Sequence, residues 1–384
     1  MSDLKQLQAE RTQIFQDVYD GKIPKRVPIE ISVNWDGGID LLQIDKRKAL
    51  WNLDTYPDFF DAVCKNVKTD KSPVNMSGHI PIPDQILESA IFKMGADGTV
   101  QHPDVITLYA DEYDEFIEDP YYFLCTKLMP RMYPALNASP FESSKALTKG
   151  ILSKNENMAK AGATQGAMIE KYGYAPISYG GATLAPFDCL ADHLRSFPEA
   201  MKDIRRIPEK VEAACEALIP LLHKKGISPK SSRYFRTFIP LHMAPYMNHK
   251  AFARFYAPTY TALLKLLSES GAGVKMFVEA DWMPHIDYLA ECTDRTEMQF
   301  EFGDAKIAKE KVGNEHILSG FYPLTLLQTG TTQECIDYAK KLIDTLAPGG
   351  GYIFNLDKSI FSFRDPILKN LTAVLDTVRE YGVY

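Results

Sequence analysis

The chain has 384 residues, of which 45% are hydrophobic, and a formal net charge of -7 at pH 7. An acidic chain is not expected to bind nucleic acid or an anionic membrane, because both require clustered Lys and Arg to neutralise phosphate. The first 22 residues are charged every few positions, and no run has the apolar length of a signal peptide or a membrane span. The sequence therefore predicts a cytoplasmic protein that acts on a small molecule or a protein partner.

The first part of the chain predicts two strands after an amphipathic helix in the first 20 residues. The first strand lies in PKRVPIEISVNW and is expected to end near Trp35. The second is expected in VNMSGHI, residues 74–80.

Residues 98–172 predict an insertion. Residues 98–110 contain two short β-like runs that predict a hairpin, and the sequence from Asp111 to Tyr172 is helical in pattern. Breaks are expected at Asp119-Pro120 and at Met129-Pro130, because proline ends or interrupts helices. This helical excursion could serve as a lid, a docking platform or the surface of a homodimer.

The rest of the chain alternates strands and helices. After a third strand near 175–181, strands are expected near 235–242, 274–280, 297–302, 316–321 and 351–356, with helices near 248–270, 284–292, 304–312, 331–346 and 366–382. Eight strands in this alternation predict an α/β fold, a (β/α)8 TIM barrel, as one domain over residues 1–384.

Three of these strands end in side chains that bind metals or transfer protons. His242 ends FRTFIPLH, Glu279 ends VKMFVE, and Glu301 ends EMQFE. Since the active site of a parallel barrel forms at the carboxyl ends of its strands, the three side chains are expected to converge. They would suit a zinc ion with an open position, or proton transfer without a metal. The alternative is that all three are structural.

The loop VEADWMPH adds three candidates at the mouth of the barrel. Asp281 and His285 are predicted to assist Glu279 in catalysis, and Trp282 could stack on an aromatic substrate. Equally, Trp282 could pack under a helix while Asp281 caps the helix that starts at Pro284.

Two further residues are candidates for substrate binding. Lys358 follows the last predicted strand at the same end of the barrel, although it could equally lie in a solvated turn with Asp357. Tyr322 ends the strand HILSGFY.

Several segments resemble the uroporphyrinogen decarboxylase superfamily. They include FARFYAPTYTALLKLLSESGAGVKMFVEADW, AKEKVGNEHILSGFYP, GGGYIF and NLTAVLDTVREYGVY, in an order that covers most of the chain. The likeness is to the branch of cobalamin-dependent methyltransferases, in particular the methyltransferase I component of O-demethylases that act on methoxylated aromatics. The resemblance implies a uroporphyrinogen-decarboxylase-like barrel, a partner corrinoid protein that carries cobalamin, and zinc as a candidate metal.

The chain departs from two other branches of this superfamily. The region that holds the carboxylates of uroporphyrinogen in the decarboxylases reads RVPIEISVNWDGG, without a cluster of Arg. Where thiol-methylating relatives bind zinc through His-x-Cys, this chain has Glu279-x-Asp281. Oxygen ligands leave a harder ion, so the site is predicted to assist an oxygen leaving group.

The resemblance therefore implies transfer of a methyl group from a small methoxylated aromatic compound to a corrinoid protein. Two alternatives remain open, namely a cofactor-free decarboxylase and a barrel that binds a corrinoid or tetrapyrrole without turnover.

Overall fold

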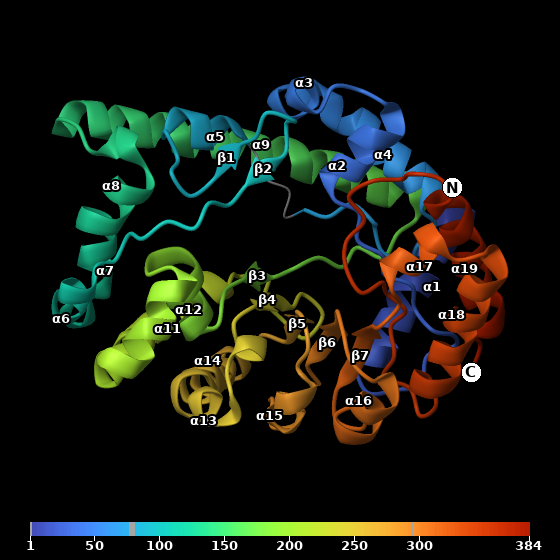
Figure 1. Ribbon diagram of the computed structural model, residues 1–384. Helices are drawn as coiled ribbons and strands as arrows, with labels where there is room; N and C mark the ends of the chain where they lie inside the picture. Colours follow the sequence, from blue (N-terminus) through green and yellow to red (C-terminus); the bar gives the residue numbers. More distant parts are fainter. Residues whose placement is uncertain (1, 77–80, 294) are drawn as a thin grey trace.

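A parallel five-stranded sheet lies at the centre of a mixed α/β fold (Figure 1). The computed structural model describes residues 2–76, 81–293 and 295–384. The sheet has the order β3-β4-β5-β6-β7, and its strands are β3 (Gly181–Ala182), β4 (Thr237–Leu241), β5 (Val274–Val278), β6 (Glu297–Phe300) and β7 (Ile317–Gly320). These strands confirm the parallel β-α alternation predicted for the second half of the chain.

The register of the sheet brings the ends of its strands level. Leu241 pairs with Val278, and Val278 pairs with Phe300. The next residue of each strand is one of the three candidates, so His242, Glu279 and Glu301 must lie on one edge of the sheet.

Outside the sheet, the remaining predicted strands form single-residue bridges. These bridges are parallel and join Leu318 to Tyr352, Phe354 to Ile29, Val33 to Val74, and Lys71 to Ala175. Each of these segments is too briefly paired to count as a strand. Residues 77–80 of the predicted second strand lie outside the described residues. The first strand was expected to reach Trp35, but Trp35 begins a helix whose N-terminus is capped by the side chain of Asn34.

The helices cover the outside of the sheet and extend beyond it. The N-terminal part contains α1 (Ser2–Tyr19), α2 (Trp35–Leu42), α3 (Lys46–Trp51), η1 (Leu53–Thr55), α4 (Tyr56–Asn66), α5 (Pro81–Ile86), η2 (Ala110–Glu112), α6 (Tyr113–Glu118), α7 (Pro120–Phe123), η3 (Leu124–Leu128), α8 (Met129–Met132), η4 (Pro134–Leu136) and α9 (Pro140–Tyr172). The C-terminal part contains α10 (Pro186–Asp188), η5 (Cys189–Leu194), α11 (Phe197–Arg206), α12 (Pro208–Gly226), η6 (Ala244–Tyr246), α13 (His249–Ala251), η7 (Phe252–Tyr256), α14 (Ala257–Glu269), η8 (Met283–His285), α15 (Ile286–Ala290), α16 (Ala305–Lys311), α17 (Leu324–Thr329), α18 (Thr332–Leu346) and α19 (Ile367–Tyr381).

The inserted segment is helical as predicted, but two of its details differ. The hairpin pairs β1 (Lys93–Met94) with β2 (Val100–Gln101), so it begins before residue 98. The chain does not break at Met129-Pro130, because η3 is a π-helix that leads directly into α8. Pro130 lies in the first turn of α8, where proline is tolerated although it lacks an N–H.

Helix α1 covers the amino ends of the strands. Its side chains Phe15 and Tyr19 are buried in a small apolar cluster that includes Ile177, Ile317 and Ile353. The opposite, carboxyl ends of the strands are free of this helix.

Among the described helices, none combines the length and apolar character that crossing a bilayer requires.

Candidate active site

The carboxyl edge of the sheet brings His242 and Glu279 into contact. The imidazole Nε2 of His242 lies 3.4 Å from Oε2 of Glu279, and its Nδ1 lies 3.5 Å from Oδ2 of Asp192. Both ring nitrogens therefore face a carboxylate. This arrangement orients the ring and favours its protonated form.

Asp188 and Asp192, from α10 and η5, support His242 from behind. The carboxylate of Asp188 is fully buried and accepts hydrogen bonds from the backbone N–H groups of His242 and Met243 and from the hydroxyl of Tyr256. Asp188 thus holds the end of β4 in place, while Asp192 contacts the ring.

The surrounding carboxylates keep His242 protonated at neutral pH. Burial alone would lower its pKa, but the contact with Asp192 and the charges of Asp188 and Glu279 outweigh this effect and raise the pKa to about 9. The pKa of Glu279 is raised, first by burial and then by the nearby carboxylates of Glu301 and Asp192. The pair can therefore donate a proton at His242 and accept one at Glu279.

Glu301 belongs to a second ion pair beside the first. Its Oε1 lies 2.5 Å from Nζ of Lys358, and its Oε2 accepts a hydrogen bond of 2.8 Å from the backbone N–H of Ala280. Ala280 has a φ of 57°, a left-handed conformation that few residues other than glycine adopt. Burial raises the pKa of Glu301, but Lys358 and this N–H lower it further than burial raises it, so Glu301 is ionised.

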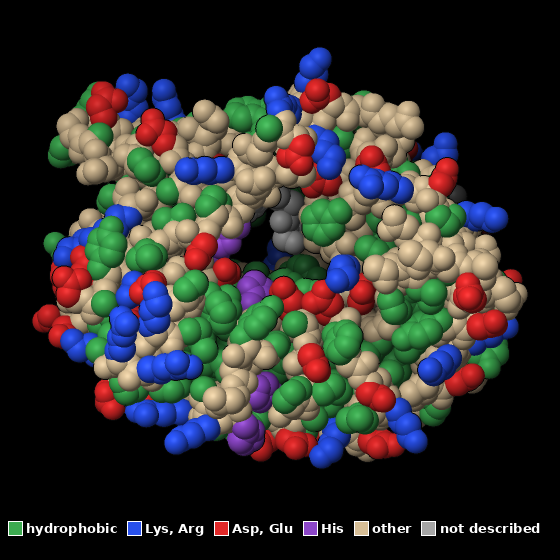
Figure 2. Space-filling view, in the orientation of Figure 1, with side chains coloured by type: hydrophobic (Ala, Val, Ile, Leu, Met, Phe, Trp, Pro, Cys, Tyr) green, Lys and Arg blue, Asp and Glu red, His purple; other side chains and the backbone are tan. Residues whose placement is uncertain are grey.

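The two ion pairs lie at an accessible part of the molecule. Figure 2 shows a hollow near the centre of one face, with histidine and acidic side chains along its edge. Three exposed aromatic side chains, Tyr246, Phe302 and Phe361, follow the ends of β4, β6 and the last predicted strand. They give the end of the sheet that carries the site an apolar rim.

The predicted zinc set does not fit the side chains as they lie. Among the described residues, no three His, Cys, Asp or Glu side chains are grouped so as to hold a metal ion. Both oxygens of Glu301 are occupied by Lys358 and Ala280, and both nitrogens of His242 face carboxylates. A zinc ion at His242, Glu279 and Glu301 would have to displace Lys358.

The three candidates in the loop after Glu279 differ in burial and in the contacts they make. Asp281 is exposed and accepts a hydrogen bond from the N–H of Met283, but the N-cap position of η8 is Trp282, so Asp281 is not the predicted helix cap. Trp282 is fully buried, with Phe252 and Tyr256 each 5.9 Å from its ring. Stacking on a substrate would require Trp282 to leave this aromatic cluster.

His285 is buried in the same cluster. Its ring stacks on Phe252 at 4.1 Å, and its Nε2 lies 3.1 Å from the carbonyl oxygen of Met247. Burial lowers the pKa of His285, so it is neutral at pH 7. It is not brought into contact with Glu279.

Of the three residues predicted to contact substrate, Trp282, Tyr322 and Lys358, only Lys358 contacts a member of the site, Glu301. The side chain of Tyr322 is fully buried, and its hydroxyl donates to the carbonyl oxygen of Cys335 on α18. Asp357, the residue before Lys358, accepts a hydrogen bond from the N–H of Leu324 and so caps the start of α17.

Sequence reasoning predicted Glu279 but missed Asp188 and Asp192, the other two acidic residues that contact His242. Asp192 also lies within 3.8 Å of His102 and 3.6 Å of His193, so three imidazoles surround one carboxylate. His102 directly follows β2 of the hairpin, and Asp192 and His193 lie in the π-helix η5. None of them stands at the end of a predicted barrel strand, so the search along strand ends did not include them. The spacing Asp188-x3-Asp192 in a helical segment was the available signal, since such residues share a helix face.

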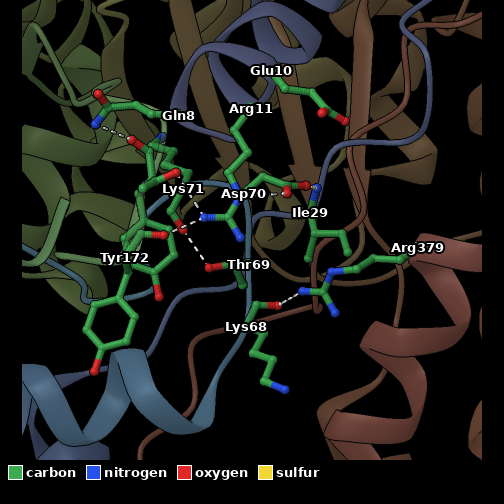
Figure 3. A network of polar contacts seen from close by, with 12 residues as sticks. Gln8, Glu10, Arg11, Ile29, Lys68, Thr69, Asp70, Lys71, Tyr172 and Arg379 are labelled. Atoms are coloured by element: carbon green, nitrogen blue, oxygen red, sulfur yellow. Dashed lines mark hydrogen bonds and ion pairs between the residues drawn. The ribbon is translucent and has the colours of Figure 1, made fainter. Parts of the chain in front are cut away.

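A cavity of about 330 Å³ lies elsewhere, between α1, α9 and α19, and is lined by Arg11, Lys68 and Arg379 among others. Figure 3 shows how these cations are used. Arg11 donates to the carbonyl oxygens of Tyr172 and Gly173 at the end of α9, and Arg379 donates to that of Lys68. These contacts hold helix ends together, which is a structural role.

Comparison with known proteins gives one line of evidence. No protein-family model matches the chain, and no curated protein matches it. The fold is similar to that of a solved methyltransferase from Methanosarcina mazei, with a TM-score of 0.61 and 16% sequence identity over 97% of this chain and 98% of that one. At this identity the likeness shows a shared fold and nothing finer.

Proposed function

We propose that this chain is a methyltransferase that moves the methyl group of a small methoxylated, aromatic compound to the cobalt of a partner corrinoid protein. The observation that carries the proposal is the placement of His242 between Asp192 and Glu279 at the rim of the sheet. The fold likeness to a solved methyltransferase supports the reaction class.

The proposal includes a closed (β/α)8 barrel. In a closed ring, the segments that form only single-residue bridges would lie between β7 and β3. The parallel bridges join each of these segments to its neighbours in that ring. Closure would surround the site with strand ends on all sides, as in other barrel enzymes.

His242 would act as the acid in this reaction. When the bond between the methyl carbon and the ether oxygen breaks, the oxygen keeps the bonding electrons and needs a proton or a positive charge. The imidazolium of His242 would donate that proton, and Glu279 and Asp192 would keep it charged until then. Lys358, 2.5 Å from Glu301, would add positive charge at the same rim.

The corrinoid would supply the nucleophilic cobalt that accepts the methyl group. The exposed rings of Tyr246, Phe302 and Phe361 offer apolar contacts to a large planar ring at the mouth. Zinc is not part of the proposal, because it would have to displace Lys358.

Replacement of Glu279 by Gln separates an enzyme from a binding module. An enzyme is expected to lose about 100-fold in kcat, since the carboxylate that keeps His242 charged is gone, whereas its affinity for the corrinoid protein changes little. Glu291→Gln, an exposed position at the end of α15, is the matched control. Unchanged turnover in Glu279→Gln would contradict the proposal, and CO2 release without a corrinoid would indicate the decarboxylase.

A further inference from the structure

The outward face of α9 carries apolar side chains that nothing in the described chain covers. The helix runs for 33 residues along the upper edge of the molecule in Figure 1. Leu152 is 62% exposed and Met158 is 57% exposed, and Ile151 beside them is also exposed. The opposite face is buried against α4 and α5 through Gly150, Asn157, Ala161, Thr164 and Met168.

The exposed face follows a regular 4-3 spacing. Its residues are Thr148, Leu152, Asn155, Ala159, Gly162 and Gly166, all of them exposed. This spacing lets two helices pack with their side chains interleaved, as in antiparallel helix pairs.

Two glycines on this face have no explanation within one chain. A Cβ added at Gly162 or Gly166 would meet no atom within 4 Å. Glycine inside a helix costs about 1 kcal/mol relative to alanine, and neither position needs the space for its own fold. Small residues would allow a second helix to approach closely.

We propose that a second copy of this chain packs on this face, with the two α9 helices antiparallel and crossing near Ala159 and Gly162. The pairing is self-complementary, as a two-fold interface requires. The exposed large side chains Ile151, Leu152 and Met158 precede the crossing, and the small side chains follow it. The larger half of one helix therefore meets the smaller half of the other.

The charges beside this face complement each other in this orientation. The two helices cross near residue 160. Lys149 lies 11 residues before this point and Glu170 lies 10 residues after it, and both side chains are exposed. Neither has an ion pair with another residue of the described chain. The antiparallel arrangement brings Lys149 of each copy near Glu170 of the other, whereas a parallel arrangement would not.

The contact is a single helix pair, so the dimer is expected to be reversible. Specific interfaces usually bury at least about 1,000 Å² in total, and one pair of helices lies at or below that area. Sedimentation velocity of the whole chain over a wide concentration range should show a monomer that converts to a dimer. A monomer at every concentration would overturn the proposal.

Gly162→Leu is the most direct variant. Within one chain it should leave the melting temperature unchanged or raise it, because leucine favours helix and meets no neighbour. In the dimer it holds the helices apart, so the dissociation constant should rise at least about tenfold. Lys154→Leu, on the same helix but away from the 4-3 positions, is the control and should dimerise like the parent.

Charge reversal tests the orientation. Lys149→Glu and Glu170→Lys should each weaken the dimer, and the double variant should restore it. If the dissociation constant of the dimer is unchanged by Gly162→Leu and by both charge reversals, the dimer forms through another surface. That result would overturn the proposal.

Discussion

At the scale of single residues, the site is built from two ion pairs that share one edge of the sheet. His242 is held by Asp192 and Glu279, and Glu301 is held by Lys358 and the N–H of Ala280. The side chains of the positive members, His242 and Lys358, are partly exposed, so the site can meet negative charge that develops on a substrate oxygen.

The protonation of His242 should set the upper pH limit of activity. Its pKa of about 9 means that the acid form is lost as pH rises through that value, and kcat/KM should fall with it. Asp192→Asn removes the hydrogen-bond partner that raises this pKa, so the fall should move to lower pH. The measurement is the pH profile of kcat/KM for both proteins, and identical profiles would contradict the role of Asp192.

The metal content of the purified protein tests the fit of zinc. Lys358→Met frees one oxygen of Glu301, so this variant should retain more zinc than the parent after dialysis. Elemental analysis provides the measurement. One zinc per parent chain that is lost in His242→Ala would show instead that the ion displaces Lys358 in solution.

At the scale of elements, sequence patterns located the strand ends but not the side chains around them. His242, Glu279 and Glu301 could be predicted because they directly follow β4, β5 and β6, whose register is fixed by parallel pairing. Trp282 could not be placed, because a loop residue has no periodicity that tells a buried side chain from an exposed one. Asp192 was missed because its contact with His242 is a tertiary one, made across 50 residues.

Trp282 should behave as a core residue. Trp282→Ala removes a fully buried ring from contact with Phe252 and Tyr256, so the free energy of unfolding should fall by about 3–5 kcal/mol. Denaturant unfolding measures this change, and Trp51→Ala, at a partly exposed ring on α3, is the comparison. A loss of less than about 1 kcal/mol together with a higher KM would favour the stacking role instead.

At the scale of the whole molecule, buried polar contacts tie the two ends of the chain together. Asp70 is fully buried and binds Arg26 through two bonds of 2.7 Å. It also accepts a hydrogen bond from the N–H of Ile29 (Figure 3). The N–H of Val27 in turn donates to the carbonyl oxygen of Gly382. The bonds of Asp70 join segments that would be neighbours in the closed barrel proposed above.

Asp70→Ala should destabilise the whole fold. It leaves the guanidinium of Arg26 without its buried partner, which costs about 3–5 kcal/mol. Asp376 provides the control. It is half-exposed and forms an ion pair with Arg379 beside the cavity lined by Arg11, so Asp376→Ala should lower the free energy of unfolding by less than about 1 kcal/mol. Equal losses in the two variants, measured by denaturant unfolding, would contradict this account of ring closure.

The most direct test of the central claim is methyl transfer itself. Purified protein, incubated with cob(I)alamin and a panel of methoxybenzenes, should produce methylcobalamin and the corresponding phenol in equal amounts, and Glu279→Gln should reduce the rate by about 100-fold. Failure of the parent protein to methylate cob(I)alamin or a corrinoid protein with any member of the panel would contradict the proposed function.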